Sequence, residues 1–196
     1  MASLTPQPFR VVSLCLLLFW AGTPAFAQGQ EKAEALPPEH FAFLYWQEGY
    51  MYHLLGEYES AIERYSRAIE SFPTAEAYTY RGWSMSKLGR LQEAIGECKE
   101  AIRLDPDYGN PYNDIGVYLI NLQRMEEAVP WLKKAMRSER YCCYQFPHYN
   151  LGKILLAQGR VTEAKRSFEK ALFYMPAYES ASKALEFIRR LAIKQT

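Results

Sequence analysis

The stretch Tyr45–Pro73 reads YWQEGYMYHLLGEYESAIERYSRAIESFP, and its pattern of small and large residues returns three more times along the chain. Within it, Gly49 is followed twelve residues later by Ala61 and nineteen residues later by Ala68, with the large Tyr65 between the two alanines. A sequence period of 33 to 36 residues predicts an array of stacked repeats. The equivalent glycines are Gly49, Gly82, Gly116 and Gly152.

Each repeat predicts two helices joined by a tight turn. Gly56, Gly89 and Gly159 stand where the first helix should end, and glycine there adopts the left-handed conformation at low cost. Glycine and alanine on the facing sides allow the two helices to approach closely, and one larger residue per repeat fills the remaining space. These larger residues are Tyr65, Cys98, Leu132 and Phe168. A single hairpin cannot bury its own apolar face, so stability should come mostly from contacts between repeats.

This pattern resembles the tetratricopeptide repeat (TPR), a helix–turn–helix unit of 34 residues. The resemblance implies an all-α fold, a right-handed α-solenoid of four repeats plus a C-terminal capping helix, with nine helices in total. The repeat region is expected to span residues 39–178, and the capping helix and tail to occupy residues 179–196. The four repeats are expected at residues 42–75, 75–108, 109–142 and 145–178.

The third repeat departs from the pattern at two places. Gln123 replaces the turn glycine, Arg140 replaces the proline that closes the other repeats, and two extra residues precede the fourth repeat. The joint between the third and fourth repeats is therefore expected to be irregular. Asn110 before Pro111 predicts an N-cap, and Pro130 is expected near the start of a helix, where its missing N–H costs little.

The first 27 residues have the pattern of a secretory signal peptide. Arg10 precedes an apolar run, Val11–Trp20, and Ala25-Phe26-Ala27 supplies the small residues that a signal peptidase reads. We expect cleavage before Gln28, no membrane span afterwards, and a periplasmic or secreted protein. The alternative is an uncleaved membrane anchor, although the apolar run is shorter than the roughly 20 residues that span a bilayer. Residues 28–38 are expected to form a polar linker.

The charge balance argues against nucleic acid as the main partner. Removing the signal segment takes away only Arg10 among the charged residues, which leaves 22 basic and 22 acidic side chains. Nucleic-acid binding depends on phosphate neutralisation by a basic surface, and a chain with zero net charge offers no such excess. The basic group Lys133, Lys134, Arg137 and Arg140 is interpreted as a solvated helix face.

No motif for catalysis is present. The sequence has no phosphate-binding glycine loop, no Gly-x-Ser-x-Gly and no His-Glu-x-x-His, so we expect neither an enzyme nor a cofactor. After signal cleavage three cysteines remain, and Cys98 is interpreted as a small buried residue. Cys142, Cys143 and His148 could form part of a metal or thiol site, although zinc needs four ligands; two partly buried thiols are the simpler interpretation.

The family resemblance places a partner-binding groove on the first helix of each repeat. Aromatic side chains there would supply contact area, and amides would satisfy the backbone of an extended peptide. Some of these rings could instead pack between repeats and never contact a ligand. The expected groove residues are Phe43, Trp46, Gln47, Tyr50, Tyr80, Trp83, Asn113, Asp114, Val117, Asn121, Phe146, Tyr149, Asn150 and Lys153.

The same resemblance argues against one specific activity of the family. The version that clamps the C-terminal carboxylate of chaperone peptides uses basic and asparagine residues in its first repeats, where this chain has Trp46, Tyr50 and Tyr80. The leading hypothesis is a non-catalytic scaffold of the cell envelope that binds a peptide or partner protein in the groove, in association with an envelope complex. One alternative is a metal- or thiol-responsive binding module. The other is an accessory subunit that braces a membrane complex through its convex face or capping helix.

Overall fold

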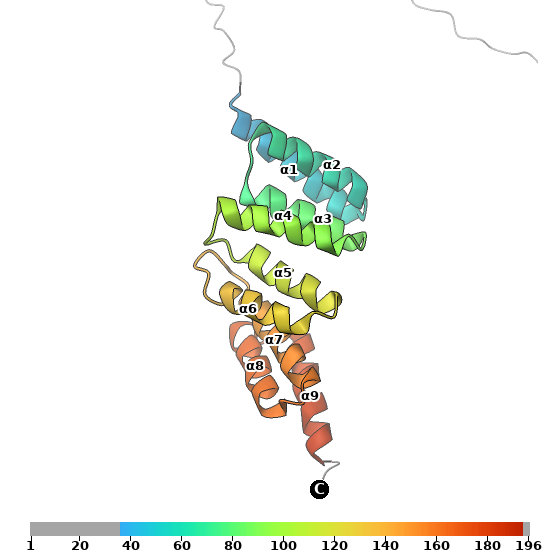
Figure 1. The fold of residues 1–196 in the computed structure, drawn as a ribbon, viewed down its shortest axis with the longest axis vertical. Coiled ribbons are helices and arrows are strands. Elements are labelled where there is room, and N and C mark those ends of the chain that lie inside the picture. Colours follow the sequence, from blue (N-terminus) through green and yellow to red (C-terminus); the bar gives the residue numbers. More distant parts are fainter. Residues whose placement is uncertain (1–35, 194–196) are drawn as a thin grey trace, which may run out of the picture. The chain divides into compact units, whose positions relative to one another are not determined.

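The computed structural model describes residues 36–193, which form nine helices (Figure 1). In this range the only β-type pairing is an isolated bridge between Tyr108 and Arg140. The predicted signal segment lies outside the described residues. The helices are α1 (Pro38–Leu55), α2 (Tyr58–Ser71), α3 (Ala75–Lys87), α4 (Leu91–Leu104), α5 (Asn110–Asn121), α6 (Met125–Ala135), α7 (Gln145–Ala157), α8 (Val161–Tyr174) and α9 (Glu179–Ile193).

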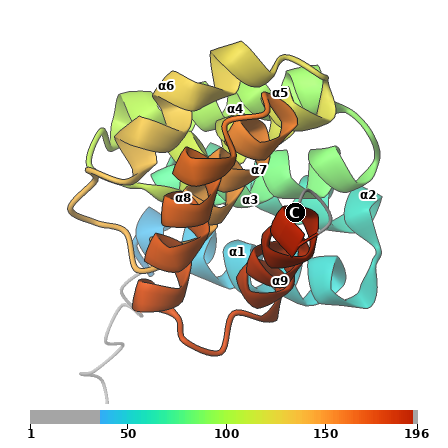
Figure 2. The ribbon, with the colours of Figure 1, turned by 90° about the horizontal axis from the view of Figure 1, so that it is seen from below.

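Successive helices pair as antiparallel hairpins that stack one after another from α1 to α9 (Figures 1 and 2). Each odd-numbered helix packs against the even-numbered helix that follows it, and α9 packs against α8. The odd-numbered helices α1, α3, α5 and α7 also approach one another directly along the stack. In stacked helix pairs the small rotation from one repeat to the next produces a concave side, which here belongs to these odd-numbered helices. We call the surface that they carry the inner face.

The predicted close approach within each hairpin is confirmed. A methyl group added to Gly49 would collide with the ring of Tyr65, and one added to Gly152 would collide with the ring of Phe168. Gly116 faces Leu132 in the same way, whereas Gly82 faces the backbone of Ala94. In three of the four repeats glycine is therefore needed because the large partner residue fills the space where a Cβ would lie, and in the second repeat the neighbouring helix itself fills it. The partner residues Tyr65, Cys98, Leu132 and Phe168 are fully buried, as the pattern predicts.

The turns within the hairpins use the left-handed backbone conformation. Gly56, Gly89 and Gly159 have φ angles of 80°, 77° and 73°. Gln123 occupies the equivalent place in the third hairpin and has a φ of 62°. A side chain in this region costs roughly 1–2 kcal/mol relative to glycine. The turn of the third hairpin therefore has the same backbone shape as the other turns, with the strain carried by Gln123.

Two local predictions for the third repeat are wrong. Asn110 is the first residue of α5 and makes no capping hydrogen bond; Gly109 stands at the N-cap position. Pro130 lies in the interior of α6, because that helix begins at Met125. A proline there removes one intrahelical hydrogen bond. At 11 residues, α6 is shorter than the 14-residue helices α2, α4 and α8.

The C-terminal helix α9 closes the apolar core of the last hairpin. Ala181 and Ile188 are buried in a cluster with Phe168 and Leu155. The charged residues Glu179, Lys183 and Glu186 are exposed on its other side. This arrangement suits a terminal element of a solenoid, which must bury one face and present a polar one. In residues 36–193 no helix is long and apolar enough to cross a membrane.

Candidate partner-binding face

Four aromatic side chains gather where α1 meets α3. Trp46 stacks on Tyr50 with ring centroids 5.7 Å apart, and the Trp46 and Tyr80 rings lie edge-to-face with centroids 5.1 Å apart. Tyr80 in turn lies 5.8 Å from Trp83. All four rings are half-buried. These rings therefore pack between the first two repeats, and part of their surface remains exposed to contact a ligand.

Phe43 extends this aromatic cluster toward the start of α1. Its ring lies 6.4 Å from Trp46, and 56% of the residue is exposed. Beside it is a pocket of about 290 Å³, which we call the N-terminal pocket. The Nε1 of Trp46 is buried and has no hydrogen-bond partner among the described residues. The pocket is lined by Glu39, Ala42, Phe43, Trp46, Phe72, Thr74 and Glu76.

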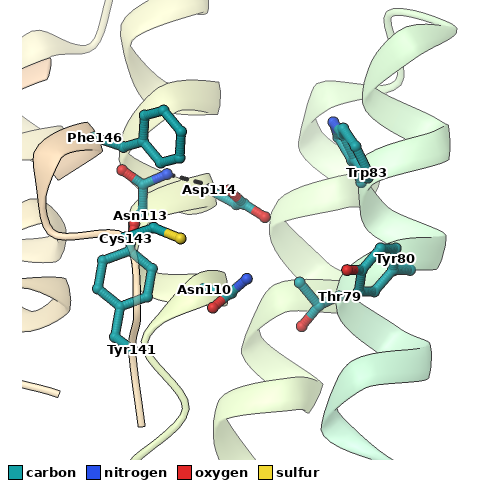
Figure 3. Close-up of a pocket in the computed structure, with 9 residues that line it drawn as sticks. All are labelled: Thr79, Tyr80, Trp83, Asn110, Asn113, Asp114, Tyr141, Cys143 and Phe146. Carbon is teal, nitrogen blue, oxygen red and sulfur yellow. Dashed lines mark hydrogen bonds between the residues drawn. The ribbon is translucent and has the colours of Figure 1, made fainter. Parts of the chain in front are cut away.

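A second pocket of about 290 Å³ lies on the other side of α3, and we call it the central pocket (Figure 3). Three elements meet there: α3, α5, and the segment 136–144 between α6 and α7, which we call the joint. The first turn of α7 completes the wall. The lining residues are Thr79, Tyr80, Trp83, Asn110, Asn113, Asp114, Tyr141, Cys143 and Phe146.

A chain of side-chain hydrogen bonds runs from α7 to Asp114. The amide of Asn150 donates to Asn113 Oδ1 at 3.3 Å, and the amide of Asn113 donates to Asp114 Oδ1 at 3.3 Å. Burial raises the pKa of Asp114 to about 7, and the hydrogen bond from Asn113 lowers it only in part. In Figure 3 the carboxylate lies between the residues of α3 on one side and Phe146, Cys143 and Tyr141 on the other.

The structure brings together five of the predicted groove residues in this pocket. These are Tyr80, Trp83, Asn113, Asp114 and Phe146. The sequence interpretation did not place Asn110, Tyr141 or Cys143 in the groove. Asn110 carried a usable signal, because it precedes Asp114 by four residues and therefore lies on the same side of α5.

The other predicted groove residues lie apart from the central pocket. Gln47, Asn121 and Lys153 are exposed on α1, α5 and α7. Val117 packs against the main apolar core, and Tyr149 packs against Phe168 and Tyr178. These last two residues contribute mainly to packing between neighbouring helices.

The joint is held against α3 and α5 by Arg140 and Tyr141. Arg140 pairs with Glu76 at 2.5 Å and with Asp105 at 2.8 Å, and its guanidinium lies 4.6 Å from the ring centroid of Tyr108. Its backbone N–H also donates to Asp107. Tyr141 is buried against Gly109. The sequence interpretation placed Arg140 on a solvated basic face. In the structure it pairs with two acidic residues and holds the joint in place.

The structure does not support the metal-site alternative. In residues 36–193 no group of three or more His, Cys, Asp or Glu side chains could hold a metal ion. Cys142 is exposed and Cys143 is half-buried, both as free thiols, so the prediction of two partly buried thiols holds only for Cys143. His148 stacks on Tyr174 at 5.5 Å, and burial lowers its pKa.

Sequence-family models described as tetratricopeptide repeat match three consecutive segments of the chain. The matched residues are 55–109, 110–142 and 146–178. The chain contains tetratricopeptide repeats.

Curated relatives share the repeats over part of their length. The chain is 35% identical over 81 residues to small glutamine-rich tetratricopeptide repeat-containing protein 2 of Mycosarcoma maydis, covering 41% of this chain and 23% of that protein. It is 24% identical over 145 residues to DnaJ homolog subfamily C member 7 of Homo sapiens, covering 72% of this chain and 28% of that protein. The chain thus spans about a quarter of the length of these two relatives.

Three solved structures share the fold. That of Pseudomonas aeruginosa pilF has a TM-score of 0.75 at 23% identity and covers 80% of this chain and 71% of that chain. PilW, a type IV pilus biogenesis factor, has a TM-score of 0.70 at 23% identity, with 77% and 70% covered. YrrB, a TPR protein with an unusual peptide-binding site, has a TM-score of 0.60 at 18% identity, with 74% of each chain covered. At these identities the likeness shows the fold alone.

Proposed function

We propose that the protein is a scaffold of the cell envelope that binds an extended segment of a partner protein along its inner face. The observation that carries this proposal is the pair of pockets on either side of α3. Glu76 lines one pocket, and Tyr80 and Trp83, one and two turns further along α3, line the other. A segment crossing α3 would place one side chain in each pocket.

The chemistry of the inner face suits a peptide. Half-buried rings such as Trp46 and Trp83 offer large contact area at a small cost in side-chain entropy. The amides of Asn110 and Asn113, which line the central pocket, can donate to the carbonyls of an extended backbone. YrrB, which has this fold, is described as having a peptide-binding site, and that description supports the same use of the face here.

Export to the envelope is part of the proposal. The support is the pattern of Arg10, the apolar run and Ala25-Phe26-Ala27, which lies outside the described residues. The mass of the protein purified from its native host tests it. Cleavage before Gln28 predicts a mature chain that begins at that residue, and a full-length chain extracted only with detergent would contradict it.

A crosslinked pull-down from the native envelope tests binding at the inner face. The test variant carries Trp46→Ala and Trp83→Ala, and the control carries Phe173→Ala, a residue of α8 that is 71% exposed and far along the chain from both pockets. Partners lost only from the double variant support the proposal. Partners retained by it would move binding to another face, such as the even-numbered helices or α9.

Truncating the two tryptophans also removes packing between α1 and α3, because Trp46 contacts Tyr80 and Trp83 contacts His53. Circular dichroism of the purified variants therefore accompanies the pull-down. If the double variant has lost helicity, Gln47→Trp together with Asn121→Trp replaces it. Both residues are exposed on the inner face, so these changes cover the face without removing a buried contact.

A further inference from the structure

We infer that the central pocket takes an arginine side chain of the bound segment, with Asp114 as its counter-ion. This inference rests on the proposed function and names the partner's anchoring residue. Three features of the pocket carry it: its charge, the geometry of its walls, and its supply of hydrogen-bond acceptors.

The charge in the pocket is unbalanced. Of the nine lining residues, Asp114 is the one acid, and no lysine, arginine or histidine is among them. Two cations lie on neighbouring rings of the inner face: Lys87 lies 5.6 Å from the ring centroid of Trp83, and Lys153 lies 5.9 Å from that of Tyr149. Neither lines the pocket. A half-buried carboxylate with no cation beside it favours a ligand that brings one.

The walls of the pocket are suited to a planar cation. Tyr80 and Trp83 from α3 face Tyr141 and Phe146 from the other side of Asp114 (Figure 3). Rings on both sides of a carboxylate can stack on a guanidinium while its N–H groups reach the carboxylate oxygens. The ammonium of lysine lacks this planar fork, so the geometry favours arginine.

The pocket also offers acceptors for the remaining N–H groups of a guanidinium. One oxygen of Asp114 accepts from Asn113, which leaves the second oxygen without a donor among the described residues. The Asn110 side chain and the Thr79 hydroxyl lie in the same lining. A guanidinium has five N–H donors, and these groups together can accept several of them.

The titration of the surrounding groups agrees with this geometry. The negative charge of Asp114 contributes to raising the pKa of Tyr80 on α3, Tyr118 on α5 and Tyr141 in the joint. It also raises the pKa of Cys98 on α4. No cation lowers the pKa of Asp114 itself, and burial is the main cause of its raised value. Binding a guanidinium would hold Asp114 ionised, and affinity should fall as the pH is lowered below about 7.

Selection from a displayed library of random 12-residue peptides tests the inference. The target is the full mature chain, in wild-type form and as Asp114→Asn, which keeps the shape of the side chain and removes its charge. Glu126→Gln is the matched control, because it removes one carboxylate from an exposed site on α6. Trp83→Ala reports whether selected peptides use the inner face.

The expected result is enrichment of arginine at one position by the wild type and Glu126→Gln, and loss of that enrichment with Asp114→Asn. Affinity of a selected peptide should fall by about tenfold or more when its arginine is replaced with citrulline, which has the same shape without the charge. Peptides that bind without arginine but need Trp83 would overturn the arginine assignment and leave the proposed function standing. Equal enrichment of lysine would overturn the guanidinium assignment. If no selected peptide depends on the inner face, both proposals are wrong.

Discussion

The guanidinium of Arg140 lies 2.5 Å from the carboxylate of Glu76, a residue 64 positions earlier in the chain. The same guanidinium pairs with Asp105 at 2.8 Å. Together these contacts fasten the joint to α3 and to the end of α4. The joint contributes Tyr141 and Cys143 to the central pocket, so the pocket depends on this long-range connection.

Replacing Arg140 with alanine should lower the free energy of unfolding by about 1 kcal/mol at low salt and by less at high salt. Exposed ion pairs are individually weak, but two pairs and a ring contact share this side chain. Arg90→Ala is the control, because Arg90 pairs locally with Glu93, three residues away in the sequence. Urea denaturation of both variants at two salt concentrations checks the difference. Equal losses would mean that the joint is not held by Arg140.

Two glycines should respond to alanine with opposite signs. At Gly152 the added methyl group would collide with the ring of Phe168, and we expect a loss of roughly 1–3 kcal/mol. Gly96 lies inside α4, is exposed, and has open space around the new methyl group. Alanine there should stabilise the protein by roughly 0.5–1 kcal/mol, since it restricts the unfolded chain and favours helix. Thermal melts of the two variants measure both effects. Stabilisation by Gly152→Ala would contradict the packing described between α7 and α8.

Gln123→Gly should stabilise the protein by roughly 1 kcal/mol. Gln123 has a φ of 62°, a conformation that glycine adopts without steric cost. The reciprocal change, Gly56→Ala at a φ of 80°, should destabilise by a similar amount. Chemical denaturation of the two variants measures the change in the free energy of unfolding of each. If Gln123→Gly is destabilising, the Gln123 side chain makes a contact that outweighs the backbone strain.

Asp114 should make the protein less stable as the pH rises from about 4 to about 7. The ordinary pKa of 3.8 applies to the unfolded chain, whereas burial raises the folded value to about 7. Between these values the folded chain holds a proton that the unfolded chain has released, so stability falls with rising pH and levels off above 7. At pH 8, Asp114→Asn should therefore be more stable than the wild type by up to roughly 4 kcal/mol, with little difference at pH 4. Denaturation curves at the two pH values test this. A variant that is less stable at pH 8 would mean that the carboxylate already has a favourable partner.

Much of the fold can be predicted from the sequence because the same side-chain contacts recur in every hairpin. Gly49 faces Tyr65 and Gly152 faces Phe168, and this repeated pairing leaves a period in the sequence. The interior position of Pro130 could not be predicted as easily. Pattern alone does not give the start of a short helix to within a turn, and α6 begins five residues before that proline.

The central pocket was predicted only in part. Tyr80 and Asp114 stand at equivalent places, two residues before the repeat glycines Gly82 and Gly116. Trp83 follows Tyr80 by three residues, so the helix places it on the same face. Tyr141 and Cys143 reach the pocket because the joint folds back over α5, guided by the pairing of Arg140 with Glu76. Such a long-range contact has no period in the sequence. The contribution of Tyr141 and Cys143 to the pocket therefore could not be predicted from the sequence pattern.

Site-specific photo-crosslinking tests whether a partner binds at the inner face. A benzophenone amino acid placed at Gln47 or Asn121 reports on the inner face, and the same group at Glu126 or Phe173 reports on the even-numbered helices; all four residues are exposed. Irradiation in the native envelope, followed by mass spectrometry, identifies what lies within reach of each position. We expect Gln47 and Asn121 to crosslink to a common partner, and Glu126 and Phe173 not to. Crosslinks to that partner only from Glu126 or Phe173 would contradict binding at the inner face.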